Sequence, residues 1–151
     1  MAIPHFASVK DRVANGLQPF PGGFEWLQRH GFRTVLRLRL PEEDDSADRR
    51  EVERLGLGFV SLEVSPTTLN RAVVDEFNRV VSDSAGLPLF VYDRDGLLAG
   101  GLWYLHFRLV DRLTDAEAMD RAIALGLKTD ASEAHRTYWI AVQRLLSGAR
   151  P

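Results

Sequence analysis

The sequence predicts an α/β domain with three layers, in which a short, mainly parallel sheet lies between helices. The spacing of apolar residues changes several times along the chain, between the alternation of strands and the longer period of amphipathic helices. Residues 88–93 (PLFVYD) form a short apolar run, which is typical of a central strand buried on both faces. Strands that alternate with helices usually form a parallel sheet covered on both sides.

The first half of the chain is expected to hold two helices and two strands. After an irregular opening, Pro21-Gly22-Gly23 precedes a short helical stretch that ends at Gly31, since glycine commonly follows the last turn of a helix. Residues 34–39 then alternate like a strand. The next expected features are an acidic segment at 42–48, a helix that ends near Gly56 and a strand at 57–64.

Helices predominate in the second half. Thr67 or Thr68 is expected to cap a helix with an apolar face. Residues 100–110 (GGLWYLHFRLV) are apolar almost all round, which predicts a helix buried inside the domain. The remaining expected features are a helix capped by Thr114 that runs through Leu125, a stop at Gly126 and an amphipathic helix at 133–147.

Length and composition exclude several classes of protein. A chain of 151 residues has the size of one domain, so we expect residues 1–151 to form a single domain. With 19 basic and 21 acidic residues and a net charge of -2, the chain lacks the positive surplus of nucleic-acid and anionic-membrane binders. It contains no cysteine, which excludes disulfides, thiolate metal sites and a cysteine nucleophile.

The expected location is the cytoplasm. The sequence has neither the apolar run of a signal peptide nor the ~18–20 apolar residues that cross a bilayer. Lys10 and Lys128 are its only lysines, and this preference for arginine suggests a GC-rich bacterial genome.

A glycine-rich loop follows the buried strand. Ligand sites of parallel sheets lie beyond the carboxyl ends of the strands, and residues 92–101 (YDRDGLLAGG) lie there. Unpaired amides in such a turn, together with the start of the next helix, can bind an anion. Glycines also simply permit a tight turn, so the glycines alone leave both interpretations open.

The chain resembles the cysteine-dependent protein tyrosine and dual-specificity phosphatases, in particular their small bacterial branch. The resemblance runs from about Phe6 to Ser147 and includes Gly16-Leu17-Gln18-Pro19, Leu38-Arg39 and Asp115-Ala116-Glu117-Ala118. The family's signature loop, H-C-x-x-G-x-x-R-[ST]-G, precedes a buried helix. The resemblance implies a tyrosine-phosphatase-like topology and a reaction in which a thiolate attacks phosphorus while an arginine grips two phosphate oxygens.

Along that signature the loop keeps its glycines, Gly96 and Gly101, but lacks the reactive groups. Asp93 stands at the cysteine position, Ala99 at the arginine position and Gly100 at the hydroxyl position, and Tyr92 replaces the histidine. A phosphate dianion would also meet Asp93 and Asp95. At ~4 Å and an effective dielectric constant of about 20, each unit of like charge costs on the order of 4 kcal/mol, which Arg94 offsets only in part. On the loop that carries the family's general acid, Glu63 is the only carboxylate.

We therefore expect a catalytically inactive pseudophosphatase that acts as a binding or regulatory module, without an intact catalytic residue and without a cofactor. Its partner would be an unidentified protein or a small anion, and neither nucleic acid nor a membrane is expected. The expected binding loop comprises Asp93, Arg94, Asp95, Gly96, Leu97, Leu98, Ala99, Gly100 and Gly101.

Two alternatives remain open. The loop also resembles motif one of haloacid-dehalogenase-type phosphohydrolases, D-x-D-G-[TV]-L, which implies a Mg²⁺-assisted enzyme. Asp93 would then be the nucleophile or a metal ligand and Asp95 the acid/base. That motif normally opens its domain, whereas only 58 residues follow Asp93 in this chain of 151. The second alternative is an anion-binding domain that uses the loop amides and Arg94.

Other polar residues are expected to serve the structure. His106 lies on the buried helix and is expected to be a core imidazole with hydrogen-bond partners. The acidic run 42–45, together with Asp48, is expected in a solvated loop that pairs with Arg37 and Arg39 on the neighbouring strand.

Overall fold

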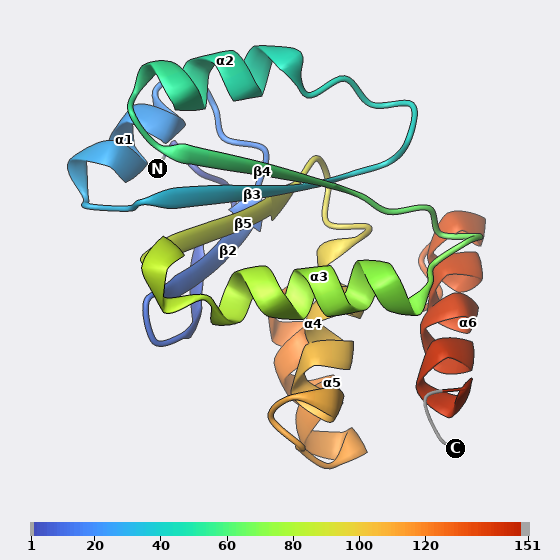
Figure 1. The fold of residues 1–151 in the computed structure, drawn as a ribbon. Coiled ribbons are helices and arrows are strands. Elements are labelled where there is room, and N and C mark those ends of the chain that lie inside the picture. Colours follow the sequence, from blue (N-terminus) through green and yellow to red (C-terminus); the bar gives the residue numbers. More distant parts are fainter. Residues whose placement is uncertain (1, 149–151) are drawn as a thin grey trace.

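The computed structural model describes residues 2–148, which form a five-stranded sheet between two layers of helices (Figure 1). The α/β class expected from the sequence is confirmed. The strands are β1 (Ala7–Lys10), β2 (Val13–Leu17), β3 (Thr34–Arg39), β4 (Gly58–Glu63) and β5 (Leu89–Asp93). The helices are α1 (Gly23–Arg29), α2 (Ser46–Arg54), α3 (Arg71–Ser82), a short 3-10 turn η1 (Ser84–Gly86), α4 (Ala99–Leu109), α5 (Asp115–Ala124) and α6 (Glu133–Gly148).

The strand order is β1-β2-β5-β3-β4, and only the pair β1 and β2 is antiparallel. All five residues of β5 are buried, as the apolar run at 88–93 predicts for a central strand. Tyr92 lies level with Arg37 of β3 and Gly16 of β2. Asp93, the last residue of β5, therefore lies at the carboxyl edge of the parallel part of the sheet.

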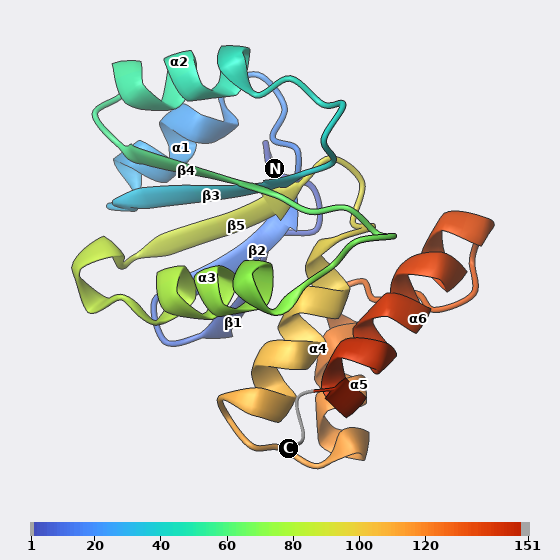
Figure 2. The ribbon, with the colours of Figure 1, turned by 45° about the vertical axis from the view of Figure 1, so that its right-hand side comes forward.

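Two hydrophobic cores lie on opposite faces of the sheet. Helices α1 and α2 cover one face, and α3 to α6 lie on the other (Figures 1 and 2). Because side chains alternate along a strand, Phe90 and Tyr92 belong to the core under α1 and α2, whereas Leu89 and Val91 belong to the other. From Ala99 to Phe107 every residue of α4 is buried, which confirms the predicted buried helix.

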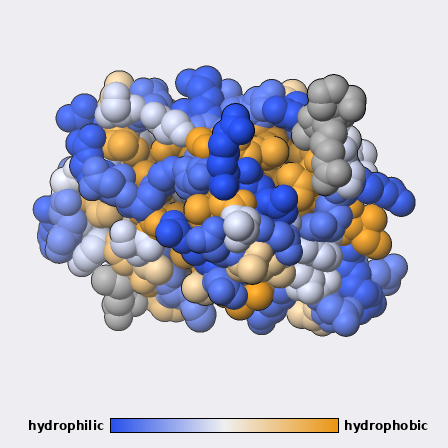
Figure 3. Space-filling view, turned by 90° about the horizontal axis from the view of Figure 1, so that it is seen from below, coloured by the Kyte–Doolittle hydropathy of each residue, from blue (hydrophilic) through white to orange (hydrophobic). Residues whose placement is uncertain are grey.

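The outer face of the helical layer is mixed in character. Figure 3 shows apolar residues in small areas between hydrophilic ones on this side of the molecule. Ile123 of α5 and Ile140 of α6 are among the exposed apolar side chains. Among residues 2–148 no helix is long and apolar enough to span a membrane.

Two local expectations are corrected. The opening that was expected to be irregular forms the β1–β2 hairpin. Helix α3 is capped by Asn70, whose Oδ1 accepts a hydrogen bond from Val73 N at 3.0 Å, and not by Thr67 or Thr68. The predicted cap of α5 is confirmed, because Thr114 forms a reciprocal capping box with Glu117.

Candidate functional site

The site is the loop that joins β5 to α4. Asp93 ends β5 and is only 1% exposed, and α4 begins at Ala99. Gly96 adopts a left-handed backbone with φ of 91°, a conformation that favours glycine. The turn folds the loop back over the end of β5, and its amides point inward.

These amides bind the side chain of Asp93. Its Oδ1 accepts a hydrogen bond from Gly96 N at 3.0 Å, and its Oδ2 accepts from Leu98 N at 2.7 Å and Ala99 N at 3.2 Å. Two of these donors belong to the start of α4, where the helix dipole also favours a negative charge. The cradle that could bind an external anion therefore already holds a carboxylate of the chain itself.

Burial raises the pKa of Asp93 to about 6, and the negative charge of Asp95 adds to the rise. The hydrogen bonds from the three amides act in the opposite direction, because they stabilise the ionised form. The carboxylate is consequently the predominant form at neutral pH, and acidification below pH 6 protonates it inside the loop.

The outer side of the loop is closed by ion pairs. Arg94 lies 3.1 Å from Glu43 Oε2 and 3.4 Å from Asp95 Oδ2, and Asp95 Oδ1 also accepts a hydrogen bond from Leu97 N at 3.2 Å. The hollow that these residues share with Asp93 has ≈ 0 Å³ of space for a water-sized sphere. Arg94 is thus shared between two carboxylates, and the loop has no open cavity on this side.

The start of α4 is packed tightly, most clearly at the hydroxyl position of the phosphatase signature. Ala99, at the arginine position, is 2% exposed. A Cβ on Gly100, at the hydroxyl position, would lie 2.7 Å from the Cα of Leu127. A Cβ on Gly101 would lie 2.7 Å from Tyr138 Cε2. A residue larger than glycine at either position requires its neighbours to move.

A polar network that the sequence revealed only in part lies beneath the loop. Asp48 Oδ2 accepts hydrogen bonds from Tyr92 Oη at 2.6 Å, Arg37 Nη1 at 3.0 Å and Gln18 Nε2 at 3.0 Å. The expectation that Asp48 lies in a solvated loop is wrong, because Asp48 is a residue of α2 and its side chain is 17% exposed. The sequence indicated the pair of Arg37 with Asp48, but it gave no signal that Tyr92 and Gln18 also donate to this carboxylate.

The sequence also predicted ion pairs for two arginines and a buried histidine. Arg37 and Arg39 form the expected ion pairs, with Asp48 at 3.0 Å and Asp45 at 3.4 Å respectively. Glu63, the only carboxylate at the position of the family's acid, pairs with Arg39 at 3.5 Å. His106 is fully buried, as expected of a core imidazole. Its Nδ1 lies 2.9 Å from Asn78 Oδ1 and its Nε2 lies 2.7 Å from Lys10 Nζ.

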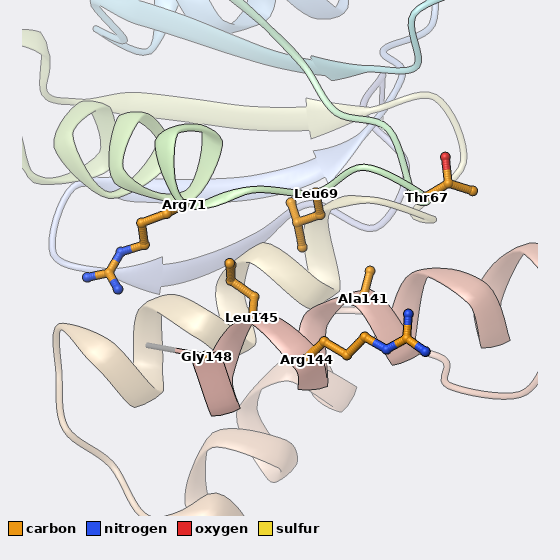
Figure 4. A pocket seen from close by; sticks show the side chains of 7 residues that line it. All are labelled: Thr67, Leu69, Arg71, Ala141, Arg144, Leu145 and Gly148. Atoms are coloured by element: carbon orange, nitrogen blue, oxygen red, sulfur yellow. The ribbon is translucent and has the colours of Figure 1, made fainter. Parts of the chain in front are cut away.

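Another cavity, of ≈ 360 Å³, lies between the start of α3 and helix α6. Figure 4 shows that its two arginines, Arg71 and Arg144, extend in opposite directions, whereas Leu69 and Leu145 lie between them. Arg71 is also paired with Asp75 at 3.0 Å. The two guanidinium groups therefore do not form a joint anion site.

The fold is similar to those of several solved structures. The core catalytic domain of the PP-IP phosphatase SIW14 from S. cerevisiae superposes with a TM-score of 0.74 at 15% identity, covering 98% of this chain and 95% of that one. TpbA from P. aeruginosa gives a TM-score of 0.71 at 16% identity, with 98% and 92% covered. These likenesses concern the fold.

Sequence similarity gives the family. The rice protein "Probable NAD kinase 2, chloroplastic" (Oryza sativa subsp. japonica) is 30% identical over 80 residues, which are 50% of this chain and 8% of that protein. The chain thus corresponds to a small part of this much longer relative. A family model described as "DSP-PTPase phosphatase fused to NAD+ Kinase" matches residues 2–138. The chain therefore belongs to this family of dual-specificity and tyrosine phosphatase domains, and the resemblance inferred from the signature loop is confirmed.

Proposed function

We propose that this domain is a non-catalytic module, a pseudophosphatase whose signature loop is closed by its own Asp93. The hydrogen bonds from Gly96, Leu98 and Ala99 to the Asp93 carboxylate carry the proposal. A phosphate ester needs such amides for its own oxygens, and it also needs an arginine and a nucleophile. Here the amides are taken, and the cysteine and arginine positions hold Asp93 and Ala99.

The two alternatives have weaker support. A Mg²⁺ ion would require Asp93 to turn away from its three amides and Asp95 to leave Leu97 and Arg94. Among residues 2–148 no group of three or more metal-ligand side chains is gathered in one place. An external anion would compete with Asp93 for the same amides, and the nearby Arg94 already has Glu43 and Asp95 as partners.

Hydrolysis and thermal-shift measurements on the whole chain test this proposal. We expect no turnover of an aryl phosphate, with or without Mg²⁺, and no stabilisation by phosphate, vanadate or Mg²⁺. Mg²⁺-dependent hydrolysis that is lost in Asp93→Asn would overturn the proposal in favour of the enzyme. Stabilisation by oxyanions that is lost in Arg94→Gln would favour the anion-binding domain.

A variant that gains oxyanion binding would test directly whether Asp93 occupies the loop amides. Asp93→Ser removes the carboxylate and frees the three amides, so phosphate or vanadate should raise the melting temperature of the variant but not that of the wild type. Asp95→Ser removes a carboxylate from the same loop while Asp93 still occupies the amides, and it should gain nothing. An equal response of the two variants would contradict the view that Asp93 fills the cradle.

We further propose that the module acts on an NAD kinase domain, either in the same polypeptide or as a separate protein. The family description, which joins this domain to NAD+ kinase, supports the pairing. Co-sedimentation of the chain with the NAD kinase of its own organism should show a complex. In a kinase assay, addition of the chain should change the rate of NAD phosphorylation. TpbA, which has the same fold, is the control for nonspecific binding, and a result equal to that control would overturn this pairing.

A further inference from the structure

A cavity of ≈ 340 Å³ lies at the opposite end of β5 from Asp93. Its size is within the range of small-molecule sites. It is formed by the β1–β2 hairpin, the end of α1 and the residue that precedes β5, and no residue of the 92–101 loop lines it. The lining residues are Phe6, Ser8, Arg12, Val13, Ala14, Trp26, His30, Phe32 and Pro88.

Aromatic side chains form most of the wall. Phe6 meets Trp26 edge to face at 5.3 Å and Phe32 at 6.2 Å, and His30 stacks on Trp26 at 3.9 Å. Phe6, Trp26 and Phe32 are only partly buried. Because these rings are fixed by their mutual contacts, they need little rearrangement when the ring of a ligand packs against them. Partly exposed aromatic groups around a hollow are typical of a binding site.

The charge of the cavity indicates the sign of its ligand. Of the described residues that line it, Arg12 carries the only formal charge, and none is an aspartate or a glutamate. Arg12 has a left-handed backbone with φ of 59° in the turn between β1 and β2. That conformation is uncommon for residues other than glycine and costs on the order of 1 kcal/mol. Arg12 is exposed and lies at the rim of this cavity, whose lining residues include no carboxylate to pair with it.

His30 adds a hydrogen-bond acceptor to the wall. Its Nδ1 lies 2.8 Å from the carbonyl oxygen of Trp26, and because a carbonyl can only accept, this nitrogen carries the proton. In the neutral imidazole Nε2 is then left as an acceptor. A ligand ring with an N–H group could donate a hydrogen bond to this Nε2 atom.

We propose that this cavity binds a planar aromatic molecule that carries an anionic group. The ring packs against Phe6, Trp26 and Phe32, and the anionic group lies beside Arg12. Adenosine 5′-monophosphate is a suitable probe, because it has a flat ring, amino donors and a phosphate. This site is independent of the signature loop, so Asp93→Asn, which keeps an acceptor for the loop amides, should bind the probe as the wild type does.

Calorimetric titration of the whole chain with adenosine 5′-monophosphate, adenosine and inorganic phosphate tests the proposal. We expect the nucleotide to bind with a dissociation constant below about 1 mM, adenosine to bind more weakly and phosphate not to bind. Arg12→Gln should weaken nucleotide binding about two- to fivefold and leave adenosine unchanged. Trp26→Leu should weaken both, while Trp139→Phe, on α6, should affect neither.

Several outcomes would overturn the proposal. One is the absence of nucleotide binding up to about 10 mM. Another is binding that neither Arg12→Gln nor Trp26→Leu alters. If Trp26→Leu does not fold, Phe32→Leu is the second test of the ring contact, and unchanged binding in that variant has the same meaning. Sedimentation that shows a dimer lost in Trp26→Leu, without nucleotide binding, would assign the cavity to a second copy of the chain instead.

Discussion

Replacing Asp93 by asparagine alters the charge of the loop while nearly preserving its shape. The amide oxygen of asparagine can accept from Leu98 and Ala99 in place of Oδ2, but its NH₂ group then faces the N–H of Gly96. An unsatisfied buried donor costs about 1–3 kcal/mol. The wild type carries a cost of its own, because burial raises the pKa of Asp93 to about 6 from an ordinary value of 3.8. That difference corresponds to about 3 kcal/mol at pH 7. The two costs nearly cancel, so the free energies of unfolding should agree within about 2 kcal/mol at pH 7.

The pH dependence separates the two proteins. Because the pKa of Asp93 is higher in the folded state than in the unfolded chain, the folded state takes up the proton first. Asp93 therefore adds stability as the pH falls from about 6 towards 4. Between pH 7 and pH 5 the wild type should gain about 1 kcal/mol relative to Asp93→Asn. Denaturant unfolding of both proteins at the two pH values measures this gain, since all other titrating groups are common to both. An equal difference in stability at the two pH values would refute the assignment of a buried, titrating carboxyl group to the loop.

Two further predictions concern the helix that follows. Gly100→Ala should destabilise the fold by about 1–3 kcal/mol, because its Cβ would lie 2.7 Å from the Cα of Leu127. Gly58→Ala, whose Cβ would lie no closer than 3.6 Å to a neighbour, is the control in the same urea titration, and equal losses would contradict the packing argument. Burial and the charge of Lys10 lower the pKa of His106 to about 4, so the unfolded chain binds the proton first and stability is lost as the pH falls from 6.5 towards 4. His106→Gln should abolish this loss, which we expect to exceed about 1 kcal/mol between pH 7 and pH 5. Parallel stability profiles for the two proteins would show that His106 does not titrate in this way.

The central strands and the buried helix could be predicted because their apolar patterns are complete within short segments. Strand β3 occupies the predicted residues 34–39. The hairpin was missed because β2 reads VANGL, and asparagine and glycine are unfavourable in strands. Its strand conformation depends on parallel pairing with β5 from Val13 to Leu17, and that contact between distant segments leaves no periodic signal.

In the candidate site, too, the local features could be predicted and the contacts between distant residues could not. The position of the loop, its retained glycines and the absence of a thiol followed from the sequence and the resemblance. The occupation of the amides by Asp93 did not, although aspartate side chains often bind backbone amides a few residues further on. The contacts of Asp48 with Tyr92 and Gln18 join residues 44 and 30 positions apart. They depend on how α2 packs on the sheet, which no local pattern contains.

Filling the cradle links the fold to the proposed loss of phosphatase chemistry. Loop amides that converge at a buried helix start need a negatively charged or strongly accepting partner, and a chain without the cysteine thiolate must supply another. Asp93 provides that partner from the residue that already ends β5. In the proposed module, the ionised carboxylate would oppose an external anion by charge and by occupancy. A partner that binds the outer surface of the loop would meet Arg94 between Asp95 and Glu43. Recognition at that surface would depend on how these ion pairs rearrange and would require no phosphate.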